Sequence, residues 1–415
     1  MGRKVIVVGG GASGMAAAIM AARQGAQVTI LEHMDRVGKK LLSTGNGRCN
    51  LTNLSMESGC YHCSQPGFPM KAIRCFDVGH TLGFLEELGI MVKSKNGYIY
   101  PNSEQASAVL DLFRLELLRL QIQSITGCQV KQLHSKKGQR FFAVTDQGGF
   151  SGDALILAAG SKAAPATGSD GSGYRLAERF GHKVITPLPA LVQLCCEGRH
   201  FKQLAGVRCE AEISLFCAGK RLSSALGEVQ LTEYGVSGIP TFQVSRFAST
   251  SLEKKKPVEI ALDFLPAKSQ EETEQFLKKR ALQMPHLEIE DFLTGVLHKK
   301  LAAVLVKLSH IPARQAAADV PQDAWERLAR QIKSFQAAVS ATKSFEHAQV
   351  CCGGVDTRDI LPETMESKLV PGLYLAGELL DVDGICGGYN LQWAWTSGCL
   401  AGIHAGSPNR LPHRK

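Results

Sequence analysis

Three glycines near the start of the chain have a spacing that suits phosphate binding. Gly9, Gly11 and Gly14 follow the apolar run Val5–Val8 in the pattern G-x-G-x-x-G. After a buried parallel strand, the first glycine permits a tight turn, the second lets a pyrophosphate approach the backbone, and the third lets the next helix pack closely. An alanine-rich helix over 13–24 would then direct its free amides and the positive end of its dipole toward the phosphates.

An acidic residue stands where such a site needs one. The apolar run Gln27–Leu31 predicts a second strand, and it ends at Glu32. A carboxylate about twenty residues beyond the glycines can accept hydrogen bonds from the hydroxyl groups of an adenosine ribose. It favours FAD or NAD over a nucleotide that carries a 2′-phosphate. Strand, glycines, helix, strand and acid together predict a dinucleotide-binding βαβ unit.

A polar loop, 33–53, follows the acid. It contains three glycines, three asparagines and the cations Lys39, Lys40 and Arg48, with little helical or strand periodicity. A loop with so many backbone donors and side-chain amides is suited to holding a polar ligand. Because it comes directly after the ribose-binding strand, we expect it to contact the same nucleotide.

The whole chain is typical of an α/β protein with more than one domain. Its 415 residues exceed the size at which one hydrophobic core usually stops growing. The first predicted strand begins close to the first residue, which leaves no room for a signal peptide, and no apolar run is long enough to span a membrane. We therefore expect a cytoplasmic protein without membrane insertion, in which the thirteen cysteines are mostly reduced.

The net charge of +9 comes from 47 basic and 38 acidic residues. The basic residues fall in short scattered runs such as Lys254–Lys256 and Lys278–Arg280, which usually belong to solvated faces. There is no dense basic stripe with interleaved aromatic residues. The composition therefore predicts a small-molecule substrate, not a nucleic acid.

The middle of the chain changes periodicity several times. The first part continues with helices at 76–88 and 105–120, then strands at 129–133 and 141–145 that are joined by a turn at 136–138. Short alternating stretches from 187 to 264 predict an antiparallel β domain. From 266 to 342, leucine spacing and a capping box predict helices.

Two later strands resemble elements of FAD enzymes. The buried run that ends in Ala159 and Gly160 resembles the strand that returns to the nucleotide in flavoproteins with two dinucleotide sites. The run Leu373–Ala376 leads into Gly377 and Glu378, and a glycine-rich loop then leads into an apolar helix. This last element resembles the C-terminal part of enzymes of the glutathione-reductase type. There, the strand and acid contact the ribityl chain and pyrophosphate, and the helix N-terminus faces the flavin pyrimidine carbonyl.

Four blocks of the chain resemble a family of bacterial FAD-dependent flavoproteins. They are GKKLLSTGNGRCNLTN, LTEYGVSGIP, GGVDTRDILPETMESKLVPGLYLAGE and LDVDGICGGYNLQWAWTSG. The runs TGNGRCNLTN and GGYN are its signatures, and its members include aminoacetone oxidases and 3-dehydro-bile acid delta(4,6)-reductases. The resemblance implies an α/β fold with a Rossmann-like FAD-binding domain of the glutathione-reductase type, an inserted antiparallel β domain and a helical subdomain. The expected domain bounds are 1–186 and 346–415 for the FAD-binding domain, 187–265 for the β domain and 266–345 for the helices.

The resemblance also implies an FAD site and no metal. The expected cofactor-binding residues are Gly9, Gly11, Ala12, Ser13, Gly14, Glu32, Lys40, Thr44, Gly45, Asn46, Arg48, Cys49, Ala159, Gly160, Gly377, Glu378, Gly388, Tyr389, Asn390 and Leu391.

The sequence has no second G-x-G-x-x-G, and hence no separate NAD(P)H domain. We therefore expect NADH or NADPH to reduce FAD and leave, after which flavin N5 passes hydride to an alkene conjugated to a ketone, as in a 3-oxo steroid or bile acid. Tyr389, Tyr234 and His200 are candidate donors to the forming enolate. Ile385 and Cys386 replace smaller residues that are common before GGYN, which makes Cys386 a candidate redox thiol.

Two alternative functions stay open from the sequence. One is an oxidase that takes hydride from a small amine such as aminoacetone and produces peroxide. The other is a flavin-containing protein that binds RNA or a protein partner, for which the net charge is the only support. Cys60 and Cys63 have the C-x-x-C spacing of a zinc half-site or redox pair, but no second pair follows, so we interpret them as two incidental thiols.

Overall fold

The apolar run before the three glycines forms the central strand of a parallel sheet. Its side chains are buried, Val7 completely, because both faces of such a sheet are covered. The strand order is β20–β11–β1–β2–β7, and the register pairs Val5 with Val28 on one side and with Ala154 on the other. The strands are β1 (Lys4–Val8), β2 (Gln27–Leu31), β7 (Gln123–Ile125), β11 (Ala154–Leu157) and β20 (Leu373–Leu375).

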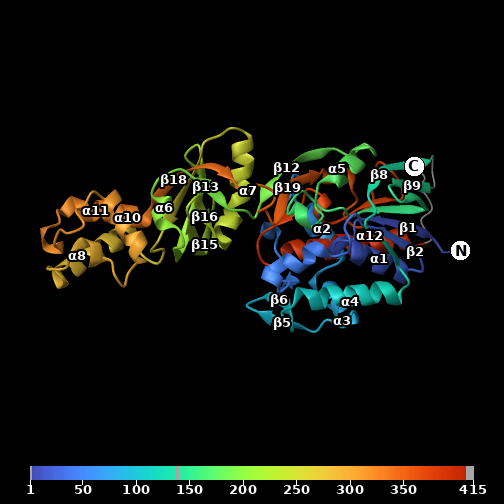
Figure 1. Ribbon diagram of the computed structural model, residues 1–415, viewed down its shortest axis with the longest axis horizontal. Helices are drawn as coiled ribbons and strands as arrows, with labels where there is room; N and C mark the ends of the chain where they lie inside the picture. The colour runs from blue at the N-terminus through green and yellow to red at the C-terminus, as the bar shows by residue number, and fades with distance from the viewer. Residues whose placement is uncertain (1, 137–139, 408–415) are drawn as a thin grey trace. The chain divides into compact units, whose positions relative to one another are not determined.

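This sheet belongs to the first of two units of the computed structural model (Figure 1). The first unit comprises residues 1–188 and 349–415, and the second comprises residues 189–348. The structure describes residues 2–136 and 140–407. The turn expected at 136–138 therefore falls mainly outside the described residues.

The first helix and the last helix of the first unit pack side by side (Figure 1). They are α1 (Ala12–Arg23) and α12 (Tyr389–Gly406). A Cβ added to Gly402 of α12 would lie 2.2 Å from the Ala17 carbonyl oxygen of α1. A Cβ added to Gly398 or Gly406, one helical turn away on either side, would lie 2.4 or 2.6 Å from a carbonyl oxygen of α1. Glycine at every fourth position thus lets the two helix backbones touch.

Smaller sheets and helices complete the first unit. Its antiparallel strands are β3 (Thr52–Asn53), β5 (Val92–Lys95) and β6 (Tyr98–Pro101) in one sheet, β8 (Val130–Lys136), β9 (Arg140–Thr145) and β10 (Gly148–Gly152) in another, and β4 (Tyr61–His62) with β21 (Asp383–Gly384). A further pair is β12 (Val184–Ala190) with β19 (Val350–Val355). The other helices are α2 (Phe68–Cys75), α3 (Val78–Glu87), α4 (Ala106–Arg119) and α5 (Ser172–Glu178).

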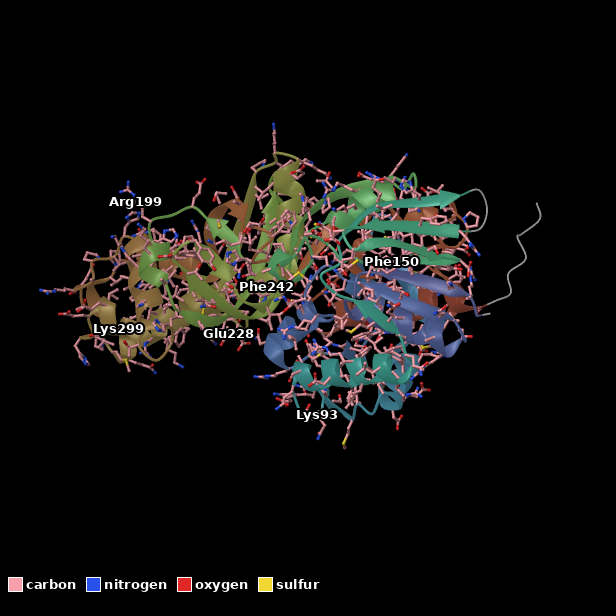
Figure 2. The ribbon with its side chains drawn as sticks, turned by 45° about the vertical axis from the view of Figure 1, so that its right-hand side comes forward. Lys93, Phe150, Arg199, Glu228, Phe242 and Lys299 are labelled. Atoms are coloured by element: carbon pink, nitrogen blue, oxygen red, sulfur yellow. The ribbon has the colours of Figure 1, made fainter. Side chains whose placement is uncertain are left out.

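The second unit contains a closed β barrel with the order β13–β16–β15–β14–β17–β18. Its strands are β13 (Leu194–Cys196), β14 (Arg208–Cys217), β15 (Lys220–Thr232), β16 (Gly235–Ser237), β17 (Val258–Asp263) and β18 (Phe335–Thr342). Its helices are α6 (Phe201–Leu204), α7 (Ile239–Glu253), α8 (Gln270–Gln283), α9 (Ile289–Phe292), α10 (Lys299–Leu308) and α11 (Gln322–Lys333). Helices α8, α10 and α11 lie beside the barrel (Figure 1). Figure 2 labels Glu228, which lies in the β14–β15 hairpin of the barrel.

One segment differs from the sequence prediction. Helices were expected throughout 266–342, but residues 335–342 form the strand β18, which pairs with β17 and β13. The alternation of buried and exposed residues in Phe335–Thr342 has a period of two. The barrel closes only when this strand, which follows the helices, fills the gap between β17 and β13.

None of the described helices is both long and apolar enough to cross a membrane. All thirteen cysteines are free thiols, and most are at least partly buried. Cys49, Cys60, Cys128 and Cys399 pack as small apolar residues in the core of the first unit.

Candidate cofactor site

The glycine turn after β1 has the geometry that its sequence predicts. Gly9 has a φ of +99°, and a Cβ there would lie 2.5 Å from the Ala158 carbonyl oxygen. A Cβ on Gly14 would lie 1.9 Å from the Gly9 carbonyl oxygen, so only glycine lets α1 start this close to the turn. A Cβ on Gly11, in contrast, would stand in open space. Among the described residues the N-cap of α1 makes no side-chain hydrogen bond, so the first amides of the helix are available to a phosphate group.

The Glu32 carboxylate lies at the end of β2 beside this turn. Its Oε2 accepts a hydrogen bond from the Gly10 N–H at 2.7 Å, and its Oε1 accepts one from the Met34 N–H at 2.8 Å. These two bonds hold the carboxylate in place. A carboxylate offers about four lone-pair positions, so the hydroxyl groups of a ribose can still bond to it. The position and the remaining acceptor capacity fit the predicted role.

The polar loop forms a short 3-10 segment, η1 (Lys39–Gly47), with an irregular end. Gly45 and Asn46 have positive φ angles of 56° and 53°, a conformation that glycine and asparagine tolerate best. Residues 45–48 are exposed. The backbone of this loop and the Arg48 guanidinium are therefore accessible to a ligand.

Thr44 and Cys49 close the base of the loop. The Cys49 N–H donates to the Thr44 carbonyl oxygen at 3.0 Å, and the Thr44 hydroxyl donates to the Leu41 carbonyl oxygen at 2.6 Å. Cys49 is completely buried, and burial raises the pKa of its thiol to about 12. Its side chain therefore supports the loop from inside.

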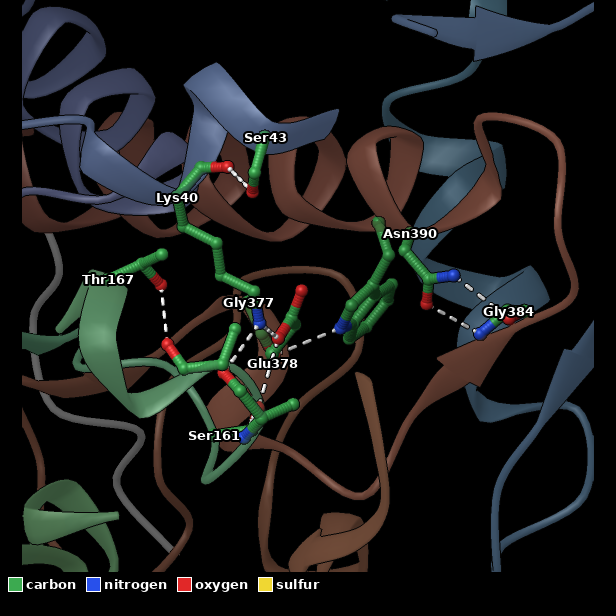
Figure 3. Close-up of polar contacts among 11 residues, drawn as sticks. Lys40, Ser43, Ser161, Thr167, Gly377, Glu378, Gly384 and Asn390 are labelled. Carbon is green, nitrogen blue, oxygen red and sulfur yellow. Dashed lines mark hydrogen bonds and ion pairs between the residues drawn. The ribbon is translucent and has the colours of Figure 1, made fainter. Parts of the chain in front are cut away.

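Lys40 and Glu378 meet in the interior of the first unit (Figure 3). Lys40 Nζ lies 2.7 Å from Glu378 Oε2 and also donates to the Ala163 carbonyl oxygen at 3.2 Å. The Ser161 hydroxyl donates to the same Glu378 oxygen at 3.0 Å. The structure thus brings together Lys40 and Glu378, two predicted cofactor-binding residues from distant parts of the sequence.

Ser161 and Tyr174 are two residues of this cluster that the set of predicted site residues omitted. Ser161 directly follows Gly160 at the end of the predicted return strand, and this position in the sequence could have identified it. Tyr174 is buried, and among the described residues its hydroxyl has no hydrogen-bond partner. Burial, with Cys351 and Glu378 nearby, raises its pKa. A buried hydroxyl without a partner beside Glu378 is consistent with a polar ligand at this place.

Ala159 and Gly160 follow β11 and shape the same corner. Gly160 has a φ of +75°. A Cβ on Gly173 of α5 would lie 2.8 Å from the Ala159 Cβ, so α5 packs directly onto this turn. On the other side, Gly377 has a φ of +72°, and a Cβ there would lie 2.3 Å from the Ser13 Oγ of α1. The turns after β11 and β20 therefore converge on the start of α1.

The GGYN run forms the turn that begins α12. The Asn390 side chain binds back to this turn: its Oδ1 accepts from the Gly384 N–H at 2.8 Å and its Nδ2 donates to the Gly384 carbonyl oxygen at 2.9 Å (Figure 3). Gly388, the N-cap residue, has a φ of +93° and makes no side-chain cap bond. Leu391 is half-buried in the first turn of the helix. Among the described residues no side chain of the N-cap residue caps α12, so the amides of its first turn can face a ligand, as the predicted contact with a flavin requires.

The two signature blocks touch each other. The Asn53 side chain donates to the Gly387 carbonyl oxygen at 3.0 Å, and the Thr52 hydroxyl donates to Gln392 Oε1 at 2.6 Å. The Trp395 indole donates to the Leu51 carbonyl oxygen at 3.0 Å. These bonds fix the end of the TGNGRCNLTN run against the start of α12. No sequence signal identifies these partners.

Two of the four candidate catalytic residues lie at this turn. Tyr389 is 6% exposed, and burial, together with a hydrogen bond to Cys60, raises its pKa. Its ring meets that of Tyr61 edge to face, with centroids 5.9 Å apart. Cys386 is half-buried, and burial raises the pKa of its thiol to about 12. At neutral pH Cys386 is therefore a protonated thiol, which is a weak nucleophile.

Tyr234 and His200 belong to the second unit. Tyr234 lies in the turn between β15 and β16, and Lys343 Nζ lies 4.0 Å from its ring centroid. His200 packs between the rings of Phe201 and Phe335, and burial lowers its pKa. Both residues remain candidate donors to the enolate, and their surroundings are described within the second unit only.

Cys60 and Cys63 have separate partners in the first unit. Cys63 Sγ lies 3.3 Å from the Thr357 hydroxyl, and burial raises its pKa to about 11. Cys60 contributes to the raised pKa of Tyr389. In residues 2–136 and 140–407 there is no group of three or more His, Cys, Asp or Glu side chains that could hold a metal ion.

Comparison with known proteins gives several full-length matches. The pattern of the HI0933-like protein Rossmann domain matches residues 3–404. The chain is 45% identical over 402 residues to a 3-dehydro-bile acid delta(4,6)-reductase of Clostridium scindens. The alignment covers 96% of this chain and 98% of that reductase. It is 30% identical over 404 residues to a ribosomal RNA dihydrouridine synthase of Haemophilus influenzae. This alignment covers 94% of this chain and 96% of that synthase. The solved structure of a 3-ketosteroid-delta4-(5alpha)-dehydrogenase from Rhodococcus jostii in complex with 4-androstene-3,17-dione covers 97% of both chains, with a TM-score of 0.47 and 16% identity.

The glycine turn after β1, the acid after β2 and the turns after β11 and β20 lie together in the first unit, and the relatives align over nearly their whole length. The chain therefore belongs to the HI0933-like protein family and is an FAD-dependent oxidoreductase with a Rossmann-type fold.

Proposed function

We propose that the protein is an NAD(P)H-driven reductase of a C=C bond that is conjugated to a ketone, in a 3-oxo steroid or bile-acid-like substrate. The observation that carries the proposal is the 45% identity, over 96% of this chain, with a reductase named for a 3-dehydro-bile acid. The site of the first unit supports it, because an FAD cradle is what such a hydride transfer needs.

Bound FAD would supply the hydride from N5 of its ring. The chain's own residues would bind and orient it. The α1 N-terminus and the turn at Gly9, Gly11 and Gly14 would hold the pyrophosphate, and Glu32 would hold the adenosine ribose. The free amides at the start of α12 would stabilise negative charge on the group that they face.

The carbonyl oxygen of an enone gains negative charge as its C=C bond is reduced, so a donor at that oxygen accelerates the reaction. Tyr389 is the candidate donor in the first unit. Its phenol is protonated at neutral pH, and it is the first residue of α12. Tyr234 and His200 are the candidates in the second unit.

The number of nucleotide-binding motifs in the sequence indicates how the electron donor reaches the flavin. With one G-x-G-x-x-G in the sequence, a nicotinamide has no nucleotide domain of its own. We therefore infer that NADH or NADPH approaches the same face as the substrate and leaves before the substrate binds.

An anaerobic titration tests this function. The purified protein is mixed with NADH or NADPH, and the oxidised-flavin absorption band is followed. Rapid bleaching, then recovery on addition of an unsaturated 3-oxo steroid, is the expected result. Bleaching by aminoacetone, with no response to either nicotinamide, would instead support an amine oxidase.

A second candidate substrate is a uridine of ribosomal RNA. Two relatives, at 30% and 28% identity, are named ribosomal RNA dihydrouridine synthases, and this chain carries a net charge of +9. The ring C=C bond of uridine is also conjugated to a carbonyl group, so both substrates use the same chemistry. Recovery of the flavin band with ribosomal RNA, together with salt-dependent RNA binding, would favour this candidate over the steroid.

A further inference from the structure

The β5–β6 hairpin lies against the GGYN turn. Tyr98 is the register partner of Asn53 in the β3–β6 pair, and the Asn53 side chain donates to the Gly387 carbonyl oxygen at 3.0 Å. A Cβ added to Gly387 would lie 2.9 Å from Tyr98 Cε1. The edge of the Tyr98 ring therefore packs on the turn that leads into α12, whose first amides are expected to face the flavin.

One face of this hairpin carries two lysines and two tyrosines. The β5–β6 register pairs Lys95 with Tyr98 and Lys93 with Tyr100. Side chains directly opposite each other on antiparallel strands share a face, and alternate residues of one strand point the same way. Tyr98 is 40% exposed, and Lys95 is exposed as well, whereas Ile99 on the other face is buried. The four side chains thus form an open surface, which we call the basic hairpin face.

A third cation, Arg48, comes from the loop that follows β2. Lys93, labelled in Figure 2, pairs with Glu104 at 2.7 Å. This hydrogen bond lowers the pKa of the Glu104 carboxyl, with further contributions from Arg48 and Lys95. Three cations thus surround one carboxylate, which leaves a net charge of +2. Because Arg48 is an expected FAD-binding residue, the basic hairpin face adjoins the expected cofactor site.

Two of these cations are available to an anion. In residues 2–136 and 140–407, the side chains of Arg48 and Lys95 have no hydrogen-bond or ion-pair partner. Guanidinium and ammonium groups bind phosphate, and nucleotide bases stack on tyrosine rings. A flat ring among cations therefore fits an adenosine diphosphate group, which combines a base with two phosphates.

The proposed electron donor carries such a group. NADH and NADPH have an adenosine diphosphate half at the end remote from the nicotinamide ring. The sequence contains one G-x-G-x-x-G, and FAD is expected to fill that site. The donor consequently needs another anchor near the flavin.

We propose that the basic hairpin face binds the adenosine diphosphate half of NADH or NADPH. This inference rests on the proposed function, since it requires a nicotinamide as the electron donor. Lys93 and Lys95 would pair with the phosphates, and the Tyr98 ring would stack on the adenine. Because the face adjoins the GGYN turn, a dinucleotide anchored there can extend its nicotinamide toward the flavin.

The test uses the FAD-loaded protein and a ligand that cannot react. ADP-ribose has the adenosine diphosphate half without the nicotinamide, and bound FAD keeps it out of the FAD site. Isothermal titration calorimetry measures its dissociation constant for Lys95→Gln, Lys95→Glu and Tyr98→Leu. Lys131→Glu is the matched control, because Lys131 is an exposed lysine of β8, which lies away from the hairpin in the first unit (Figure 1).

Lys95→Gln should raise the dissociation constant of ADP-ribose about threefold, and Lys95→Glu about tenfold, because the second change adds a like charge. Tyr98→Leu should raise it about fivefold through the lost stacking. Lys131→Glu should change it by less than about twofold. Added salt should weaken binding to the unsubstituted protein more than binding to Lys95→Glu. Flavin content and the thermal midpoint of each variant show that it is folded.

The nicotinamides themselves provide a second measurement. In anaerobic stopped-flow experiments, Lys95→Glu should raise the concentration of NADH or NADPH that gives the half-maximal rate of flavin bleaching about tenfold. The effect on the limiting rate should be smaller, because the lost contact lies at the end of the dinucleotide remote from the reacting ring.

Equal effects of Lys95→Glu and Lys131→Glu would overturn the inference. So would a failure of ADP-ribose to bind although NADH or NADPH bleaches the flavin at a saturable rate. An unchanged dissociation constant for ADP-ribose, with weaker binding of ribosomal RNA to Lys95→Glu, would overturn it and assign the face to RNA. A flavin that neither nicotinamide bleaches would contradict the proposed function instead, and ADP-ribose would still show whether the face binds an adenosine diphosphate group.

Discussion

Lys40 Nζ lies 2.7 Å from Glu378 Oε2, although the two residues are 338 positions apart in the sequence. Lys40 comes from the loop after β2 and Glu378 from the turn after β20, so their ion pair joins the N-terminal and C-terminal parts of the first unit. Each side chain is 21% exposed. The pair is therefore shielded from bulk water and still accessible to a ligand.

Lys40→Met should weaken FAD binding by about tenfold or more, the usual effect of losing one hydrogen bond to a charged group. The change leaves the Glu378 carboxylate without its cation, close to where phosphates of FAD are expected, and like charges repel. Titration of the apoprotein with FAD, followed by flavin fluorescence, measures the affinity. Lys39→Met is the matched control, because Lys39 pairs with the exposed Asp35. Unchanged affinity in Lys40→Met would show that Lys40 does not contact the cofactor.

Glu32→Ala should yield a purified protein that has lost most of its FAD. The substitution removes the predicted ribose acceptor and also the two bonds to the Gly10 and Met34 amides. The ratio of flavin to protein absorbance measures the loss. Asp35→Ala removes an exposed carboxylate from the same loop and should keep its flavin. A full stoichiometric flavin content in Glu32→Ala would exclude the ribose contact.

The nucleotide half of the site was predictable because its signal is local. The β1 run, the three glycines and Glu32 lie within one stretch of sequence, and each has a distinct steric or hydrogen-bonding reason for its residue type. The structure places the Glu32 carboxylate 2.7 Å from the Gly10 amide, beside the glycine turn. The assignment of these residues to FAD contacts remains a prediction.

Contacts between distant segments were not predictable in the same way. Hydrophobic periodicity gives the strands and helices but not their partners, so the bond from Asn53 to Gly387 and the closure of the barrel by β18 could not be derived. The helical prediction for 335–342 was wrong because the preceding leucine pattern was extended too far. The four-residue spacing of Gly398, Gly402 and Gly406 was visible in the sequence, but it does not identify α1 as the partner.

Gly402→Ala should destabilise the protein by about 1–3 kcal/mol, the usual cost of adding a methyl group to a closely packed contact. The new Cβ would lie 2.2 Å from the Ala17 carbonyl oxygen, and α1 and α12 would have to separate. Urea unfolding of the FAD-loaded protein measures the free energy. Gly83→Ala on α3 is the matched control: its Cβ would meet no neighbour within 4 Å, and alanine favours a helix over glycine. Equal stabilities of the two variants would show that α1 and α12 are not in close contact.

The double substitution Cys60→Ser and Cys63→Ser should leave NAD(P)H-driven turnover within about twofold of the unsubstituted protein. A redox pair needs a reactive thiolate, but burial raises the pKa of Cys63 to about 11, so this thiol stays protonated at neutral pH. Serine is nearly isosteric and can keep the hydrogen bonds that Cys60 and Cys63 make to Tyr389 and Thr357. Steady-state rates between pH 6 and 9 provide the test, with Cys75→Ser, an exposed thiol, as control. A fall in rate of about a hundredfold, with flavin content unchanged, would show that the two cysteines carry electrons between the nicotinamide and the substrate.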